Sequence, residues 1–142
     1  KKLRDIANRA FRSYAALGCP TRRELEDRIK EDTRKKHSHE APDLIARRIE
    51  TSLLENRHLI YDIEAVDFVM SELKQKGLDE RISAIRAVYF HEPRRTPHRG
   101  EIEGRVTKCA VDGYASRRTV YSWLSAARKM FFEARGSKLV NQ

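Results

Sequence analysis

Three observations on the 142-residue sequence predict an all-α fold in two parts. Apolar residues recur at three- and four-residue spacing over most of the chain, which places them on one side of a helix. The few glycines and prolines, 6 and 4, fall mostly between these periodic segments, and the balance of 39% apolar and 36% charged residues is typical of a folded chain. We therefore expect a helical N-terminal region with a long central helix, residues 1–76, then a helix-turn-helix domain, residues 78–136, and a flexible tail, residues 137–142.

The first 42 residues predict two helices and a linker. Helical spacing of apolar residues runs from Leu3 to Leu17, and Gly18-Cys-Pro20 ends that helix because proline cannot continue it. Thr21 and Glu24 form a capping-box pattern before a helix whose apolar stripe, from Leu25 to Ile29, is thin. The charged run 34–42 that follows is typical of a solvated linker.

A long central helix is expected from Asp43 to Lys76, because no proline or glycine interrupts this segment. At the usual rise, about 33 residues would span roughly 50 Å. We expect this helix to be too long for residues 78–136 to cover. Either residues 2–33 or a second copy of the chain must therefore pack on it. The stripe that needs this cover consists of Ile45, Ile49, Leu53, Ile60, Ile63, Val66, Met70 and Leu73.

The segment from residue 101 to residue 136 predicts two helices joined by a short turn. Glu101 to Asp112 is amphipathic, and the turn Gly113-Tyr-Ala115 has the length found in helix-turn-helix motifs. Ser116 is a good N-cap for the next helix, in which the apolar positions should face Ile102, Val106, Cys109 and Ala110. Those positions are Val120, Leu124, Ala127 and Phe131.

The opposite side of this last helix is the candidate DNA-reading surface. Its cationic and hydroxyl side chains suit base edges and phosphates in a major groove. The loop from His91 to Gly100 holds two prolines and three arginines with no apolar residue, so it must lie at the surface and is a candidate phosphate contact. The candidate DNA-binding residues are Ser116, Arg117, Arg118, Tyr121, Ser122, Ser125 and Arg128 on the helix, and Arg94, Arg95 and Arg99 in the loop.

The positive charge is concentrated in the C-terminal part. Residues 1–90 hold 19 basic and 16 acidic side chains, whereas residues 91–142 hold 11 and 5, within a net charge of +9. This asymmetry is expected of a surface that binds double-stranded DNA. No long apolar run or lipidation signal indicates a membrane.

Other chemistry is not indicated. Two distant cysteines, Cys19 and Cys109, form neither a disulfide framework nor a zinc pattern, and they favour a reducing cytoplasm. The histidines lack metal-ligand spacing, so we expect no metal and no other cofactor. The carboxylates Asp62, Glu64 and Asp67 are the closest acidic cluster, but an exposed helix face explains them, and we do not expect an enzyme.

The segment from Asp43 onward resembles a known family. The long helix is followed by Leu78-Asp-Glu-Arg-Ile-Ser-Ala-Ile-Arg-Ala-Val-Tyr-Phe90 and then by Ser116-Arg-Arg-Thr-Val with Ala127-Arg-Lys-Met130. This pattern resembles the phage-encoded RinA/ArpU transcriptional activators, whose C-terminal domain is similar to the fourth conserved region of bacterial sigma factors. The sequence departs from the family pattern in two places. Tyr114 stands where a turn glycine is commonest, and the loop 91–100 is longer than the tight link usual in sigma-like domains.

The resemblance implies an activator of phage late or packaging genes that works beside host RNA polymerase at promoter DNA, in the nucleoid of a bacterial cell. It also implies that the family's reading positions fall on Arg117, Arg118, Tyr121, Ser122 and Ser125. The alternative is a phage DNA-packaging component, a small terminase-like oligomer in which the long helix builds a ring. Such proteins more often carry the DNA-binding head first.

Overall fold

The computed structural model describes residues 2–136, and this part of the chain forms seven helices and no strand. The all-α prediction is confirmed. The predicted flexible tail, residues 137–142, lies outside the described residues. The helices are α1 (Lys2–Ala16), α2 (Arg22–Lys36), α3 (Pro42–Glu55), α4 (Arg57–Gln75), α5 (Asp79–Tyr89), α6 (Glu101–Asp112) and α7 (Arg117–Arg135).

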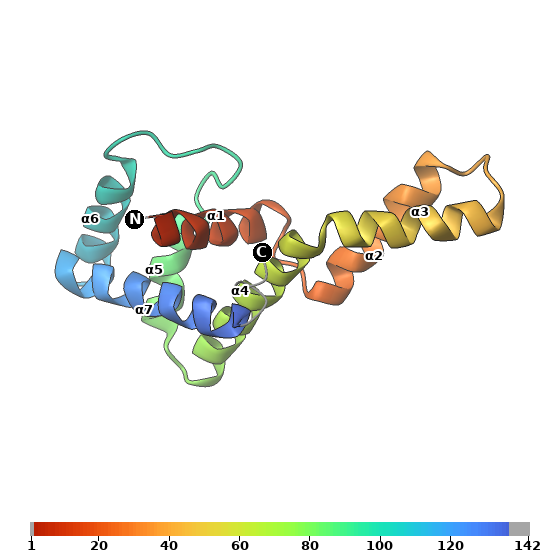
Figure 1. Ribbon diagram of the computed structural model, residues 1–142. Coiled ribbons are helices and arrows are strands. Elements are labelled where there is room, and N and C mark those ends of the chain that lie inside the picture. The colour runs from red at the N-terminus through yellow and green to blue at the C-terminus, as the bar shows by residue number, and fades with distance from the viewer. Residues whose placement is uncertain (1, 137–142) are drawn as a thin grey trace.

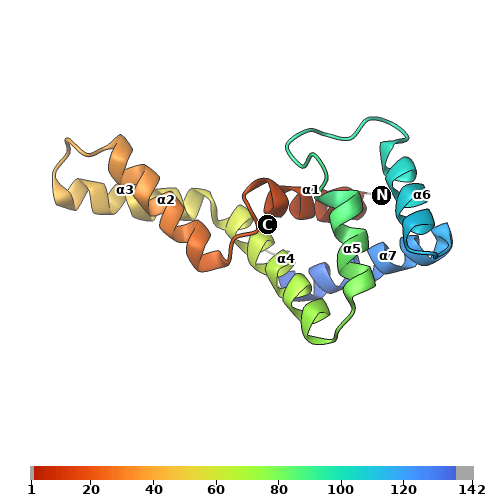
Figure 2. The same cartoon turned by 180° about the vertical axis from the view of Figure 1, so that it is seen from behind.

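Five helices, α1, α4, α5, α6 and α7, surround one hydrophobic core and form what we call the body (Figures 1 and 2). Each contributes an apolar side chain with no exposed surface: Phe11, Ile63, Ile85, Val106 and Phe131. The ring of Phe11 lies 5.5 Å from that of Tyr89 and 6.1 Å from that of Phe131, centre to centre. Helices from both ends of the sequence therefore share one core.

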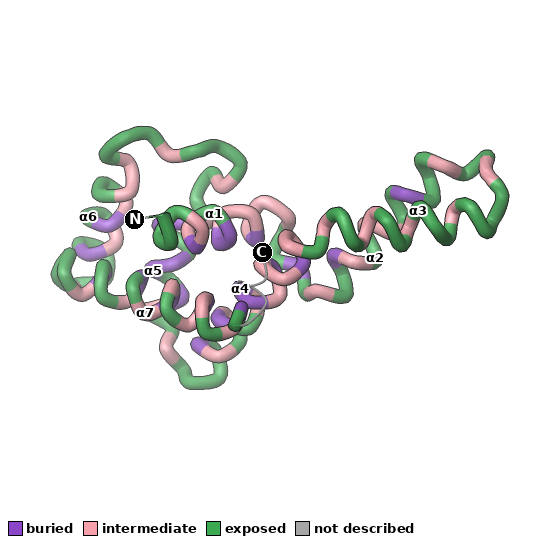
Figure 3. The backbone as a smooth tube through the Cα atoms, in the orientation of Figure 1, coloured by how far each residue is buried: buried purple, intermediate pink, exposed green. Residues whose placement is uncertain are grey.

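The remaining two helices, α2 and α3, project from the body as a hairpin, which we call the arm (Figure 1). The predicted capping box is confirmed at the start of α2, where Thr21 Oγ1 accepts from the Glu24 N–H at 3.2 Å and Glu24 accepts from the Thr21 N–H at 2.9 Å. The arm has almost no core of its own. Buried residues in α2 are Leu25 and Thr33, and α3 has none (Figure 3).

The expected single helix over 43–76 is interrupted at one residue. Asn56 adopts φ −97° and ψ 11° between α3 and α4, and its side-chain amide donates to the Ser52 carbonyl oxygen at 2.8 Å. Asparagine side chains compete with the backbone for such bonds, which weakens a helix locally. The prediction of an unbroken helix is therefore wrong, although α4 continues from α3 in the same general direction (Figure 1).

The apolar stripe of α4 is covered within the chain. Helices α1, α2 and α7 all pack on α4, and Ile63 and Val66 have no exposed surface. Cover by the N-terminal helices is thus confirmed. The C-terminal part also covers the stripe on α4, because α7 continues to Arg135 and packs against α4. The α3 part of the stripe packs on α2 instead, as expected for a stripe too long for the C-terminal part to cover. The predicted division between residues 1–76 and 78–136 stays a prediction, and the core continues across it.

Candidate nucleic-acid interface

Helix α7 begins where the sequence predicts. Ser116 has extended backbone angles, and its hydroxyl oxygen accepts a hydrogen bond from the Thr119 N–H at 3.0 Å. The preceding turn is short because α6 ends at Asp112, and Tyr114 adopts the left-handed φ of 54° with its side chain 99% exposed. The direction of α7 relative to α6 therefore depends on this strained residue.

The two sides of α7 differ as predicted. The apolar side is buried, with Val120 and Phe131 fully covered and Leu124 1% exposed, and α6 contributes Val106 and Ala110 to the same core. The other side is exposed. It carries Arg117, Arg118, Tyr121, Ser122 and Ser125, which we call the α7 outer face.

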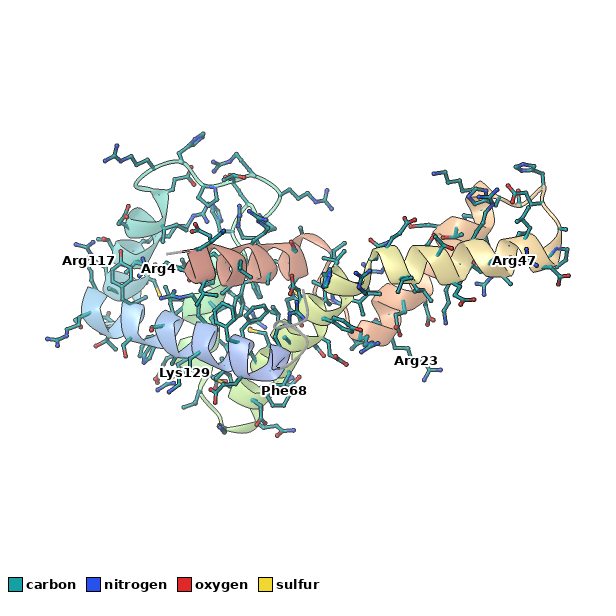
Figure 4. All side chains as sticks on the ribbon, in the orientation of Figure 1. Arg4, Arg23, Arg47, Phe68, Arg117 and Lys129 are labelled. Atoms are coloured by element: carbon teal, nitrogen blue, oxygen red, sulfur yellow. The ribbon has the colours of Figure 1, made fainter. Side chains whose placement is uncertain are left out.

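The two arginines at the start of the outer face are uncompensated. Neither Arg117 nor Arg118 takes part in a hydrogen bond or ion pair with any residue from 2 to 136. Figure 4 shows Arg117 at the end of the body farthest from the arm. Their guanidinium groups are thus available to an anion, and the nearby hydroxyls of Tyr121, Ser122 and Ser125 both donate and accept hydrogen bonds.

Arg128 has a structural contact in addition to its predicted role. Its Nη1 donates to the hydroxyl oxygen of Tyr89 at 2.8 Å, and the side chain is half-buried. Burial raises the pKa of the Tyr89 hydroxyl, and the positive charge of Arg128 partly offsets that rise. Arg128 therefore connects α7 to α5.

The three loop arginines have different surroundings. Arg95 is bound by Glu92 and by Glu101, with 2.7 Å between its Nη1 and Glu101 Oε1. Arg94 Nη2 donates to the Ala16 carbonyl oxygen at the end of α1, at 3.5 Å. Arg99 is exposed and makes no hydrogen bond or ion pair within the described chain. Carboxylates thus neutralise Arg95, whereas the charges of Arg94 and Arg99 have no carboxylate partner among the described residues.

Glu101 holds the loop to α6. It accepts from Arg95 and from the His98 N–H at 3.1 Å, and it pairs with Arg105 at 2.9 Å. These contacts, that with Arg95 first, lower the pKa of the Glu101 carboxyl to about 2. The segment 90–100 is irregular but is attached to both α1 and α6.

Helix α1 adds residues that the sequence did not single out. A groove of about 550 Å³ lies between α1, α6 and α7, and Arg4 and Asn8 line it together with Arg118, Tyr121 and Ser125. The Asn8 side-chain oxygen is buried and has no hydrogen-bond partner among the described residues. The sequence does show basic residues along α1, but nothing in it indicates that this helix lies beside α7.

Further cations of α1 crowd the same region. Arg9 and Arg12 line a second groove, of about 300 Å³, with Thr96 and Pro97 of the loop. Burial lowers the pKa of the Arg12 guanidinium, and the charges of Arg9 and Arg105 lower it further. Such crowded cations favour the approach of a polyanion, which would relieve their mutual repulsion.

The carboxylates on α4 are engaged in three separate contacts. Asp62 pairs with the fully buried Arg135 at 2.8 Å, Asp67 accepts from the Tyr14 hydroxyl at 2.9 Å, and Glu64 pairs with Arg22 at 3.2 Å. The expectation that they lie on an exposed helix face is therefore wrong. They are half-buried and connect α4 to α7, α1 and α2.

No group of three or more histidine, cysteine or acidic side chains among residues 2–136 is placed to hold a metal ion. His37 instead contacts Glu40 at 2.9 Å. No helix in the described range is long and apolar enough to span a membrane.

Comparisons with protein families, with curated proteins and with solved structures find no match to this chain.

Proposed function

We propose that the chain is a sequence-specific DNA-binding transcription regulator in which α6 and α7 act as a helix-turn-helix. In this proposal α7 enters the major groove with its outer face toward the base edges. As the sequence resemblance implies, the regulator would activate phage late or packaging genes beside host RNA polymerase at promoter DNA, in the cytoplasm of a bacterial host.

The proposal rests on the positive charge at the start of the α7 outer face, which no described residue neutralises. Arg117 and Arg118 are exposed without a partner among the described residues, on a helix whose other side is fixed in the core. Arginine pairs with the two acceptors of guanine in the major groove, and hydroxyl side chains contact several base edges. A rigid helix with a free cationic surface suits this form of recognition.

The surrounding residues suggest a division of roles. Arg4 and Arg99 carry exposed charges near α7 and in the loop, so they suit phosphates, which position a protein without reading sequence. Arg128 contacts Tyr89 and would hold α7 at a fixed orientation relative to the rest of the body. The base-reading positions are then those of the outer face, with Arg117 foremost because it lies at the N-terminal end.

The test is selection of DNA by the full chain, with sequencing of the bound fragments, followed by affinity measurements on the selected site and on random DNA. We expect Arg117→Ala to weaken binding to the selected site by roughly 1–3 kcal/mol and to affect random DNA much less. Arg23→Ala is the matched control, because Arg23 is an exposed arginine of the arm, far from Arg117 (Figure 4).

Different outcomes separate the possible roles. Equal losses on selected and random DNA would make Arg117 a phosphate contact. If selection recovers no preferred sequence, or if Arg117→Ala binds as the parent does, the proposed recognition by α7 is wrong.

A further inference from the structure

The outward side of α3 is an exposed stripe that nothing in the described chain covers. The side of α3 that faces α2 holds the half-buried Ile45 and Ile49, whereas Leu44 and Leu54 on the other side are 40% and 62% exposed. Leu44, Arg47, Thr51 and Leu54 follow each other at spacings of three, four and three residues. This is the spacing with which one helix contacts another along a single seam. We call these four residues the arm stripe.

The charges beside the arm stripe divide into two halves. Arg47 and Arg48 lie before its midpoint, with Asp43 in the first turn, and Glu50 and Glu55 lie after it, so that the first half is net positive and the second net negative. Helix α2 adds positive charge near the tip of the arm, where its last turn holds Arg34, Lys35 and Lys36. Residues 22–32 of α2, closer to the body, hold four basic and five acidic side chains and are nearly neutral.

This pattern is complementary to itself when it is turned end to end. A two-fold axis through the midpoint of α3 places the basic half of one arm against the acidic half of another. In such an interface the same patch serves on both subunits, so that residue i meets residue j and residue j meets residue i. A single α3 therefore carries both halves of a charge-matched contact.

We propose that the arm stripe is the contact surface of a homodimer in which the α3 helices of two chains pack antiparallel. The register that sets Leu44 beside the partner's Leu54 sets Arg47 level with the partner's Thr51. The partner's Glu50 is then one residue away along the helix, about 1.5 Å, within reach of the Arg47 side chain, twice by symmetry. A pocket of about 310 Å³ lies next to Leu54, lined by Leu53, Ile60 and Tyr61 among others, and it would receive the partner's Leu44.

The charged pair at the centre is available for this contact. Arg47 and Glu50 are both exposed, and neither makes a hydrogen bond or ion pair with another residue in the range 2–136. Their neighbours are occupied, because Arg48 binds Glu40 at 2.5 Å and Arg34 pairs with Glu31 at 3.6 Å. Figure 4 shows Arg47 on the arm, well away from the body.

The dimer would have a consequence for DNA that rests on the proposed function. Antiparallel arms form a four-helix assembly with one body at each end, so the two α7 helices would be held at a fixed separation. Dimeric readers of DNA bind two half-sites whose spacing mirrors the protein. A single body would be expected to bind one half-site only.

The mass of the full chain in solution, measured without DNA by light scattering and sedimentation, tests the proposal. We expect a reversible dimer for the parent chain. Arg47→Glu and Glu50→Arg each place like charges together at two symmetric contacts, so each should raise the dimer dissociation constant by about tenfold or more. A mixture of the two variants should restore dimers, as heterodimers, because both contacts are then again between opposite charges.

Lys129→Glu is the matched control, an exposed charge reversal on the body that should leave the dimer unchanged. Helix content by circular dichroism should be equal in all variants, since the substituted positions are exposed. A parent chain that stays monomeric at its highest soluble concentration overturns the proposal, as does a mixture that forms no heterodimer.

Two other results also overturn it. A ring of many copies would indicate a different assembly. A monomer in which Arg47→Glu weakens DNA binding would mean that the arm contacts phosphate. Because mass is measured without DNA, failure of the dimer leaves the DNA-binding proposal standing, and failure of DNA selection leaves the dimer standing.

Discussion

At the scale of single residues, the turn before α7 contains a conformation that tyrosine adopts poorly. Tyr114 has a φ of 54°, and its side chain is 99% exposed, so no packing compensates the strain. Left-handed conformations of residues other than glycine cost of order 1 kcal/mol or more. Glycine at this position would relieve that strain but would lose more entropy on folding.

We expect Tyr114→Gly to stabilise the protein by up to about 1 kcal/mol, because the relief of strain exceeds the entropic cost. Thermal and denaturant unfolding would measure this change. Tyr114→Ala is the control, since alanine keeps the Cβ atom and with it the strain. Equal stabilities for the glycine and alanine variants would mean that the left-handed turn is not maintained in solution.

Glu101 gives the fold a pH dependence. Its carboxyl pKa is lowered to about 2 by Arg95 and the His98 N–H. A carboxyl with a lowered pKa stabilises the folded state above its unfolded pKa of about 4.3, and this contribution is lost as the pH falls from that value toward 2. The parent chain should therefore lose stability across this window.

Denaturant unfolding of Glu101→Gln at a series of pH values should lack this component of the acid destabilisation. Glu103→Gln is the matched control, because Glu103 is an exposed neighbour on α6 whose side chain makes no ion pair with the described residues. If the parent and Glu101→Gln respond equally between pH 5 and pH 2, the contacts of Glu101 do not contribute to stability.

At the scale of elements, the loop between α5 and α6 contains one arginine that is bound to other residues of the protein and one that is not. Arg95 is bound to two carboxylates, whereas Arg99 is exposed and unpaired among the described residues. The proposed phosphate contact therefore belongs to Arg99 more than to Arg95. The sequence treats the two residues alike.

We expect Arg99→Ser to reduce the slope of log affinity against log salt by about 1 and to leave the melting temperature unchanged. Arg95→Ser should lower the melting temperature, because the loop loses its tie to α6, with a smaller direct effect on the slope. Salt titrations of DNA binding and thermal unfolding measure the two effects. An unchanged slope for Arg99→Ser would mean that this residue is not on DNA.

At the scale of the whole molecule, α7 depends on helices from the N-terminal part. Phe131 packs against Phe11 of α1, and the buried Arg135 pairs with Asp62 of α4. Burial raises the pKa of Asp62, while the charge of Arg135 lowers it, so the pair lies in a poorly solvated environment. Removal of one partner from such a pair leaves an uncompensated buried charge.

A fragment of residues 78–142 would expose the surface of α7 that α1 and α4 cover in the full chain. We expect this fragment to lose cooperative unfolding and to bind DNA far more weakly than the full chain, because its recognition helix is no longer fixed. Circular dichroism during thermal unfolding and DNA affinity measure both effects. A fragment that folds cooperatively and keeps the sequence preference would instead support residues 78–136 as a separate domain.

The sequence by itself determined the local features of this protein. Helix periods, the capping box at Thr21 and the N-cap at Ser116 depend on residues three or four positions apart, so they can be recognised from the sequence alone. The same applies to the two sides of α7. The break at Asn56 was missed because one asparagine in a helical pattern is an ordinary occurrence.

Only the tertiary structure decided which helices meet. It joins Arg128 to Tyr89, which are 39 positions apart, and Tyr14 to Asp67, which are 53 apart. It also places Arg4 and Asn8 of α1 beside the outer face of α7 and lays α7 along α4. Apolar periodicity indicates that a helix face is buried, but it does not indicate which helix covers that face. The reason is that hydrophobic burial is non-directional, so any complementary apolar face could cover it.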